Sequence, residues 1–396
     1  MAVLDVPPPL CMQDPEIELL ADSAARFFER EATPARIQKW RDDGQVERAF
    51  WRQAGEAGLL GVSIPTEYGG AGGDFRHDVA LVEQVGKHGV EGFALSLHNV
   101  IILPYVLAHG TEEQKQRWLP KLCSGESVAA IAMSEPGAGS DLQAIRTTAL
   151  KDGNGYRING AKTFISNGQI ADFIIVVAKT DPALGGKGVS LLVVETGDTG
   201  EAGKAGGAEG FRRGKALDKI GLDAQDTSEL FFDDVWIPAD NLLGPVEGQG
   251  FRQLMAELPR ERLVIAVGSV QTMEKALEVT TEYVKERQAF GQRIFDFQNT
   301  QFKLAECKAK ATVAKVFVND CVQRYMDGAL DLTTAAIAKL FATEAEWEVV
   351  DACLQLHGGY GYVNDYPIAR MFRNSRVQRI YGGSSEIMKL LIARSL

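Results

Sequence analysis

The hydrophobic periodicity of this chain changes twice along its length, and this change constrains the fold more than any other feature. Before about Gly125 and again after Gly250, apolar residues recur at the spacing of amphipathic helices. Between Ser127 and Val246 the chain carries short runs rich in β-branched and aromatic residues, broken by Gly, Asn and Asp. We therefore predict an α+β fold with an N-terminal helical domain (1–125), a middle β-barrel or β-sandwich domain (126–246) and a C-terminal four-helix bundle (247–396).

The same patterns locate individual elements. Helices are predicted over Asp14–Glu31, Asp78–Lys87, Leu95–His109, Arg260–Arg287, Phe302–Met326, Thr334–Leu356 and Ser385–Ala393. Thr111 and Gln114 form a capping-box pattern that opens a further helix through Trp118. Strands are predicted over Val128–Met133, Tyr156–Ile158, Phe173–Ala178, Val189–Glu195 and Ser228–Phe232. Gly-rich loops are predicted over Pro65–Gly73 and Gly197–Gly214, the second a mobile surface loop.

Composition narrows the class of protein. A length of 396 residues fits two or three domains, and 45% hydrophobic and 24% charged residues are ordinary for a globular chain. No apolar run approaches the roughly 20 residues that cross a bilayer, and Met1–Leu10 lacks the pattern of a targeting segment. We therefore expect a soluble cytoplasmic protein with no membrane span. The formal net charge of −11 argues against nucleic-acid binding, because phosphate binding needs a basic surface.

Several common kinds of site lack their sequence patterns. The five Cys are scattered and odd in number, which indicates buried thiols in a reducing compartment. The five His show no ligand spacing, so no metal site is expected. The patterns G-x-G-x-x-G after a strand, G-x-x-x-x-G-K-[ST] and G-x-S-x-G do not occur. A nucleotide cofactor would therefore have to be held in some other way.

Two motifs in the middle region combine flexible backbone with polar or aromatic side chains. The run MSEPGAGSD (133–141) follows a predicted strand, and its glycines allow close approach of a ligand to the backbone. The run KTFISNG (162–168) places Phe164 and Ser166 on one face of a strand, where they suit the face and edge of a flat heterocycle. Considered alone, the first motif is explained equally well by a tight turn, and the second is explained better by ordinary β packing than by a ligand site.

Further motifs, taken in order, narrow the interpretation. They are DKIG with FFDDVWIP (218–221 and 231–238), ERQAFG (286–291), QLHGG (355–359) and RIYGGSSEI (379–387). Together with the two middle-region motifs, they resemble the acyl-CoA dehydrogenase family over nearly the whole chain, from about Asp14 to Leu396. The resemblance implies FAD bound between the middle and C-terminal domains, in a homotetramer that pairs as dimers.

The resemblance also implies which residues contact each ligand. Arg287 would reach the FAD pyrophosphate of the neighbouring subunit, and a guanidinium with paired donors suits phosphate oxygens. Glu386 departs from the family pattern, which often has Gln there. The implied cofactor-binding residues are Met133, Ser134, Gly139, Phe164, Ile165, Ser166, Arg287, Phe290, Gln298, Gln355, Gly358, Gly359, Ser384 and Glu386. The implied substrate-binding residues are Ser140, Arg262, Gly382, Gly383 and Arg394.

The catalytic base is the main departure from the common family pattern. In many members a Glu follows the Tyr of the C-terminal run and removes the α-proton of the substrate, whereas this chain has Gly382. Glu261 precedes the apolar run Leu263–Val267, where partial burial would raise its pKa. Its surroundings resemble the long-chain and isovaleryl-CoA dehydrogenases, whose base is on this helix, so we predict Glu261 as the base. The alternative is a solvated Glu261 that pairs with Arg260 or Arg262.

Other carboxylates compete with Glu261 for this role. They are Glu257, Glu386 and Glu135, of which Glu135 is predicted to be structural because it lies in a turn. The implied activity is oxidation of an acyl-CoA of medium, long or branched chain, as in fatty acid β-oxidation, with electrons passed to an electron-transfer flavoprotein. The alternatives are an acyl-CoA oxidase or flavin monooxygenase of the same fold that uses O₂, and a non-catalytic flavin-holding scaffold.

Overall fold

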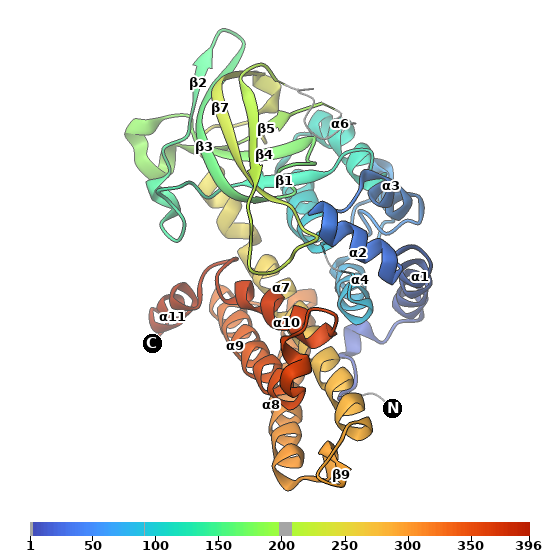
Figure 1. The fold of residues 1–396 in the computed structure, drawn as a ribbon. Coiled ribbons are helices and arrows are strands. Elements are labelled where there is room, and N and C mark those ends of the chain that lie inside the picture. Colours follow the sequence, from blue (N-terminus) through green and yellow to red (C-terminus); the bar gives the residue numbers. More distant parts are fainter. Residues whose placement is uncertain (1–2, 91, 198–207) are drawn as a thin grey trace.

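The protein consists of two helical regions joined through a β-sheet (Figure 1). The structure is a computed structural model that describes residues 3–90, 92–197 and 208–396. In Figure 1 the sheet lies beside the N-terminal helices, and the helices of the C-terminal region extend away below both. This arrangement confirms the predicted α+β order of helical, β and helical regions.

The N-terminal region is built from helices whose ends follow the capping rules. Asp14 accepts a hydrogen bond from Glu16 N–H at the start of α1, and Thr111 and Gln114 form the predicted capping box of α6. The chain takes a π-helical turn over Ser96–Ile102 directly before α5. The helices are α1 (Pro15–Glu31), α2 (Pro34–Asp43), α3 (Arg48–Glu56), α4 (Phe75–His88), α5 (Leu103–His109) and α6 (Glu112–Cys123). The sequence prediction missed α2 and α3.

Seven strands of the middle region form one curled sheet. They are β1 (Ala129–Ala132), β2 (Thr148–Asp152), β3 (Gly155–Ser166), β4 (Phe173–Lys179), β5 (Val189–Glu195), β6 (Phe211–Ala216) and β7 (Thr227–Pro238). Their order is β1-β4-β2-β3-β7-β6, and β5 pairs with β4. Residues of β4 alternate between two cores: Phe173, Ile175 and Val177 pack against α5 and α6, whereas Ile174 and Val176 pack inside the curl. Burial of both faces explains the continuous apolar runs of the central strands.

The loop predicted over Gly197–Gly214 is wrong at its C-terminal end. Residues 198–207 lie outside the described residues, but Phe211–Ala216 forms β6 and pairs antiparallel with β7. The run carries Arg212, Arg213 and Lys215 and lies at the edge of the sheet, so it lacks the apolar alternation of an internal strand. The prediction missed β2 for a similar reason, since three of its five residues are exposed.

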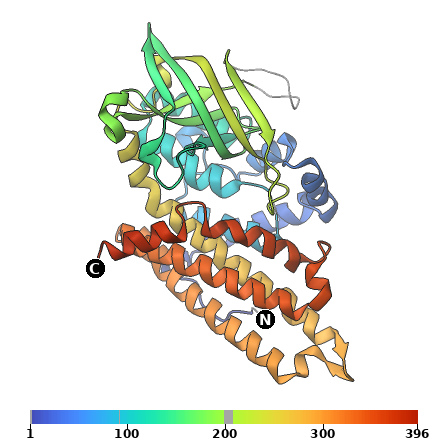
Figure 2. The same ribbon diagram turned by 60° about the vertical axis from the view of Figure 1, so that its left-hand side comes forward.

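The C-terminal region is a bundle organised around one long helix, α7 (Gly250–Glu286). The prediction started this helix at Arg260, directly after Pro259, a residue that disfavours a helix interior. The structure extends it ten residues further, since Leu254 is buried and the Gln253 amide donates to Leu243 O at 3.1 Å. The other elements are hairpin β8 (Gln288–Ala289) and β9 (Gln292–Arg293), α8 (Gln298–Met326), α9 (Leu332–Leu356), α10 (Pro367–Ser375, missed from sequence) and α11 (Ser385–Ala393). Figure 2 shows α7 passing from beside the sheet into this bundle.

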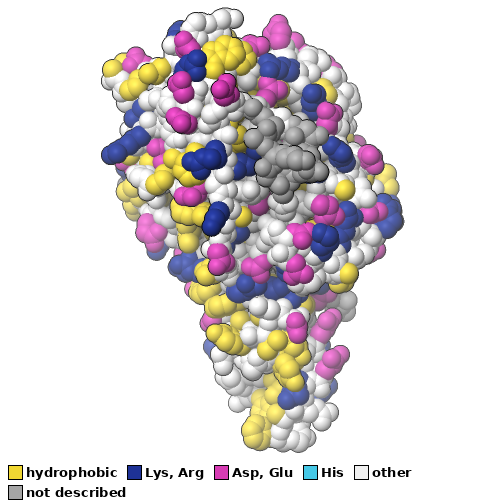
Figure 3. All heavy atoms as spheres, turned by 45° about the horizontal axis from the view of Figure 1, so that its top comes forward, with side chains coloured by type: hydrophobic (Ala, Val, Ile, Leu, Met, Phe, Trp, Pro, Cys, Tyr) yellow, Lys and Arg dark blue, Asp and Glu magenta, His cyan; other side chains and the backbone are white. Residues whose placement is uncertain are grey.

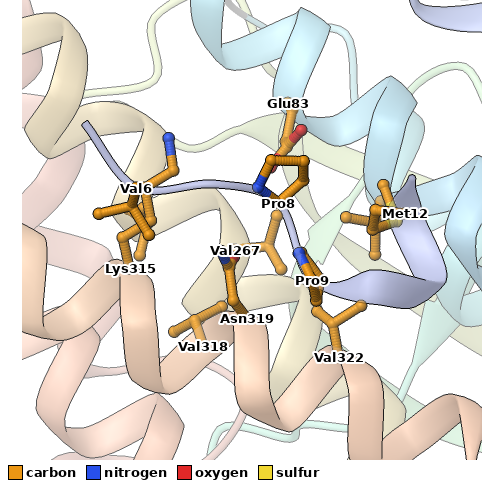
Figure 4. A pocket seen from close by; sticks show the side chains of 12 residues that line it. Val6, Pro8, Pro9, Met12, Glu83, Val267, Lys315, Val318, Asn319 and Val322 are labelled. Atoms are coloured by element: carbon orange, nitrogen blue, oxygen red, sulfur yellow. The ribbon is translucent and has the colours of Figure 1, made fainter. Parts of the chain in front are cut away.

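The N-terminal segment covers a small cavity between α4, α7 and α8 (Figure 4). The cavity has a volume of about 110 Å³ and is lined mainly by Val and Pro, with Glu83, Lys315 and Asn319 at its polar side. None of the residues predicted to bind flavin or acyl-CoA lines it. We therefore regard it as a gap under the N-terminal segment, distinct from the candidate active site.

The described residues include neither a candidate membrane-spanning helix nor a candidate metal site. Within the described ranges, no helix combines the length and the hydropathy needed to cross a membrane. Among the same residues, no group of His, Cys, Asp or Glu side chains is arranged to hold a metal ion. Across the face shown in Figure 3, Lys and Arg side chains alternate with Asp and Glu side chains.

Candidate active site

Glu261 lies on α7 with its carboxylate buried against α5. Its residue is only 6% exposed, and Tyr105 donates a hydrogen bond to Glu261 Oε1 at 2.7 Å. Burial raises the pKa of Glu261 to about 7, which the hydrogen bond from Tyr105 partly opposes and the nearby charge of Glu257 reinforces. A carboxylate with this pKa is poised to exchange a proton near neutral pH.

The neighbouring arginines do not hold Glu261 at a solvated surface. Arg260 instead pairs with Asp78 of α4 at 2.5 Å and donates to Ser63 Oγ at 3.2 Å. Arg262 is itself buried, and burial lowers the pKa of its guanidinium. The alternative of a solvated Glu261 paired with Arg260 is therefore wrong.

The loop that contains Gly382 packs directly against the same face of α7. A Cβ built on Gly382 would clash with Ile265 Cδ1, and Ile265 is one helical turn after Glu261. Gly382 and Gly383 have φ of 62° and 91°, which side-chain-bearing residues rarely adopt. The structure thus packs Gly382, 121 residues from Glu261 in sequence, against a residue one helical turn from Glu261.

Buried charges from α9 fix this loop. Lys339 is fully buried and donates to Gly383 O at 2.8 Å, while Glu344 accepts from Ser385 Oγ at 2.5 Å and pairs with Arg379 at 2.8 Å. Burial lowers the pKa of Lys339 to about 8 and raises the pKa of the neighbouring Glu346 to about 8. The sequence prediction missed Lys339 and Glu346. A lone Lys in the apolar run Ala335–Ala342 nevertheless indicates a buried charge.

The two middle-region motifs meet at the end of β1. Thr163 N–H donates to Ser134 O at 3.0 Å, so the turn after β1 lies alongside β3. The buried Lys162 donates to Met133 O at 3.0 Å, to Val177 O at 2.7 Å and to Glu135 Oε1 at 2.9 Å. Met133 and Ser134 are therefore held beside Phe164 and Ser166, as expected for residues that share one ligand.

Phe164 does not lie in a regular strand. It has φ of 61°, and the register between β3 and β7 shifts between Lys162 and Ile165. The prediction of unbroken alternation from Phe164 to Ser166 missed this bulge, which needs knowledge of the partner strand. The Ile165 side chain is buried in the core of the sheet, so only its backbone is available to a cofactor.

Phe164 and Phe290 share an unusual conformation. Both are bulky residues with positive φ, 61° and 54°, and their rings are 69% and 96% exposed. Such a backbone costs free energy, and exposure of a large ring costs more, so both features indicate positions kept for a ligand or partner. Phe290 lies in the β8–β9 turn at the far end of the bundle (Figure 1).

A second group of predicted cofactor residues gathers at this far end. The Arg287 guanidinium lies 5.7 Å from the centre of the Tyr360 ring. Gln298, Gln355, Gly358 and Gly359 are all exposed, and a Cβ on either of these two glycines would meet nothing within 4 Å. Arg287 follows Glu261 by 26 residues of helix, or about 39 Å along its axis. This second group is therefore remote from Glu261 of the same chain.

The remaining predicted residues lie around the ends of α11 and the turn after β1. Ser384 caps α11 by accepting from Ile387 N–H at 3.4 Å. Glu386 is exposed in the first turn of this helix, and backbone and Ser384 hydrogen bonds lower its pKa. Gly139, Ser140 and Arg394 are also exposed.

The donor set fits a flavin dinucleotide. Exposed Phe rings suit the flat isoalloxazine, Arg287 suits the pyrophosphate, and open space beside Gly137, Gly139, Gly358 and Gly359 allows backbone to approach a ligand.

Comparison with known proteins agrees with this arrangement. Family models of the acyl-CoA dehydrogenase N-terminal, middle and C-terminal domains match residues 14–126, 130–235 and 248–396. The chain belongs to the acyl-CoA dehydrogenase family. The family resemblance inferred from the ordered motifs is thus confirmed.

Individual members of the acyl-CoA dehydrogenase family match over almost the full chain. The chain is 44% identical to the mitochondrial long-chain specific acyl-CoA dehydrogenase of Sus scrofa, over 96% of this chain and 86% of the relative. It is 35% identical to the mitochondrial isovaleryl-CoA dehydrogenase of Pongo abelii, over 95% and 87%. Among solved structures, an acyl-CoA dehydrogenase from Geobacillus kaustophilus superposes with a TM-score of 0.91 at 44% identity, covering 96% of this chain and 98% of that one.

Proposed function

We propose that this member of the acyl-CoA dehydrogenase family is an FAD-dependent enzyme that oxidises an acyl-CoA thioester to the trans-2-enoyl-CoA, with Glu261 as the base. The observation that carries the proposal is the buried Glu261 carboxylate, with its pKa raised to about 7, one helical turn from Ile265, against which Gly382 packs. This chain has Gly382 where many family members have Glu. The carboxylate side chain is therefore absent at this position, and the backbone N–H remains. In this proposal the base, Glu261, lies on helix α7, and the hydrogen-bond donor to the thioester oxygen, Gly382 N–H, lies on the loop before α11.

In the proposed reaction Glu261 removes a proton from the α-carbon. The electrons of the broken C–H bond form the α,β double bond as a hydride leaves the β-carbon. FAD, when bound, supplies the two-electron oxidant that accepts this hydride. We propose that Gly382 N–H donates to the thioester oxygen, which would stabilise the developing negative charge and acidify the α-proton. The buried Lys339 holds the Gly383 carbonyl and so keeps this loop in place.

The two separate groups of predicted FAD residues support an oligomer. Met133, Ser134, Phe164 and Ser166 lie in the middle domain, whereas Arg287, Phe290 and Gln298 lie at the far end of the bundle (Figure 1). Since about 39 Å of helix separates Arg287 from Glu261, we propose that a second copy supplies Arg287 to each flavin. A homotetramer built as a dimer of dimers, with an electron-transfer flavoprotein as electron acceptor, completes this proposal. The cytoplasmic location stays a prediction, because the long-chain relative is mitochondrial.

The proposed substrate is an acyl-CoA of medium, long or branched chain. The 44% identity to a long-chain specific enzyme favours long straight chains. A base on α7 leaves the side of Gly382 free of a carboxylate, which is compatible with branched chains as well. Ser140, Arg262 and Arg394 are proposed substrate contacts on the strength of the resemblance.

The test is a screen of purified, flavin-loaded protein against straight and branched acyl-CoAs with an artificial electron acceptor. We expect anaerobic bleaching of the flavin by at least one acyl-CoA and slow production of hydrogen peroxide in air. Peroxide formed at the rate of substrate oxidation would favour the oxidase alternative. Absence of bleaching with every acyl-CoA would favour the flavin-holding scaffold.

A further inference from the structure

We propose that Tyr105 is a positioning residue for the catalytic base: its phenol holds Glu261 through Oε1 and so directs Oε2 toward the substrate. This inference rests on the proposed function. It concerns a residue of the N-terminal domain that sequence reasoning gave no role.

The contact between Tyr105 and Glu261 is short and shielded from water. Tyr105 is fully buried, and its hydroxyl lies 2.7 Å from Glu261 Oε1. A buried phenol needs a hydrogen-bond partner, and a bond to an ionised carboxylate is stronger than one between neutral groups. Burial and the charge of Glu261 raise the pKa of Tyr105 well above its ordinary value, so the phenol remains a donor at every working pH.

The hydrogen bond from Tyr105 engages Oε1 of the Glu261 carboxylate and leaves Oε2 available. Within the part of the chain that the structure describes, Tyr105 is the donor to Glu261, and no hydrogen bond to Oε2 is present. A carboxylate fixed at one oxygen can rotate little, so Oε2 keeps a defined direction. Proton abstraction depends steeply on such alignment, since a misplacement of about 1 Å can cost about a hundredfold in rate.

The residues on both sides of Tyr105 in α5 pack into the protein core. The neighbouring Leu103 and Val106 of α5 are fully buried in the core between α5, α6 and the sheet. The preceding Ser96–Ile102 turn is π-helical, a form that occurs frequently at functional sites. His109, one turn after Tyr105, lies 3.2 Å from Glu257, one turn before Glu261. Helix α5 therefore presents Tyr105 to Glu261 and His109 to Glu257 of α7.

Other charged groups surround the pair without replacing this hydrogen bond. The titratable or charged side chains on the elements around Glu261 are Tyr105 and His109 of α5, Glu257, Arg260 and Arg262 of α7, Asp78 of α4, Tyr325 of α8, and Lys339 and Glu346 of α9. Glu257 opposes ionisation of Glu261 and Arg262 favours it. Arg260 is paired with Asp78, and Lys339 donates to the Gly383 carbonyl. Tyr105 donates the hydrogen bond that orients the carboxylate and, like the charge of Arg262, favours its ionised form.

The test is Tyr105→Phe, which keeps the ring and removes the hydroxyl. Without a donor to the ionised form, the pKa of Glu261 should rise, and the acid limb of the kcat/KM profile should move up by about one pH unit. At pH values above this limb kcat should fall about tenfold, because the carboxylate is no longer fixed, while KM changes little. A second readout is infrared titration of the protonated carboxyl band that is absent in Glu261→Gln. In Tyr105→Phe this band should persist to higher pH.

The matched control is Tyr156→Phe. Tyr156 is also buried, in the middle domain, and donates to Glu247 Oε1 at the same distance, 2.7 Å, although this hydrogen bond is only partly buried. This variant should leave the pH profile and the infrared band unchanged. Identical profiles and bands in wild type and Tyr105→Phe would overturn the role of Tyr105. If Glu261→Gln instead retains the wild-type rate of flavin reduction, the assignment of the base fails, and the infrared titration still decides whether Tyr105 controls ionisation of Glu261.

Discussion

Two buried carboxylates in this molecule have opposite environments. Glu261 in the C-terminal domain is 6% exposed, and Glu135 in the middle domain is 8% exposed. Glu135 accepts from the Lys162 ammonium at 2.9 Å and from the backbone N–H groups of Arg146 at 2.6 Å and Thr147 at 2.9 Å. Burial favours the neutral form of Glu135, but hydrogen bonds from Thr147 and Lys162 outweigh it and hold its pKa below the ordinary value.

The comparison shows that burial alone does not make a base. Glu261 has one neutral donor and a nearby like charge, so burial dominates and its pKa rises to about 7. Glu135 has a cation and two backbone donors, so it stays ionised and ties the turn after β1 to β3 and β4. The first carboxylate is available for proton transfer, and the second shapes the backbone that we propose contacts the flavin.

The largest expected effect comes from removing the cation beside Glu135. Lys162→Met leaves a buried carboxylate without its charged partner, which should lower the free energy of unfolding by about 3–5 kcal/mol. Because the pKa of Glu135 is depressed in the folded state, the pair stabilises the fold above the ordinary carboxyl pKa, and this stabilisation is lost as pH falls. Chemical denaturation should therefore show a deficit that is large at pH 7 and shrinks toward pH 4.

An exposed ion pair provides the control for Lys162→Met. Lys303 pairs with Glu306 at 2.8 Å, and both side chains are about half exposed or more. Lys303→Met should leave the free energy of unfolding almost unchanged at either pH, because solvent screens this pair. Equal losses in the two variants would show that the ion pair of Glu135 is no stronger than a surface pair.

A smaller effect is expected from moving the carboxylate to the loop. In the Glu261→Gly background, Gly382→Glu should recover about tenfold in activity toward straight-chain acyl-CoAs, because a carboxylate base is then restored at the position that many family members use. The recovery should be partial, since the position has φ of 62° and the new Cβ clashes with Ile265. Adding Ile265→Ala should increase it. Turnover assays of the three variants would reveal the trend, and no recovery in any variant would contradict the placement of Gly382 beside the active site.

The smallest expected effect concerns the like charge next to Glu261. Activity should rise with pH as Glu261 ionises, with an apparent pKa of about 7 in kcat/KM. Glu257→Gln removes a negative charge that opposes this ionisation, so the apparent pKa should fall by less than about one unit. A pH–rate profile measures both values. An upward shift in Glu257→Gln would show that its charge does not act on Glu261 as described.

Sequence reasoning located those parts of the fold and site that depend on local patterns. Helix α11 has the predicted bounds, and the capping box of Thr111 is present. Glu261 was identified because an apolar run follows it. The RIYGGSSEI motif also showed that Gly382 replaces the Glu of many family members. Each of these signals spans only a few neighbouring residues of the chain.

The features that were missed depend on distant partners. Tyr105 is 156 residues from Glu261, and nothing near it in sequence indicates a hydrogen bond to a base. The bulge at Phe164 exists because β3 and β7 pair out of register there. From the sequence, Lys162 was only the first residue of the KTFISNG motif. In the structure its ammonium joins three segments of the middle domain. Such roles become visible only when the partner elements are in place.

The most direct test of the central claim is anaerobic flavin reduction by acyl-CoA in Glu261→Gln and Glu135→Gln, each purified with its flavin. The amide in Glu261→Gln keeps the shape and cannot accept the α-proton, so its rate should fall by about a thousandfold or more. Glu135→Gln should reduce its flavin within about tenfold of the wild-type rate, even if its stability is lower. A wild-type rate in Glu261→Gln, or a larger loss in Glu135→Gln than in Glu261→Gln, would contradict the assignment of Glu261 as the base.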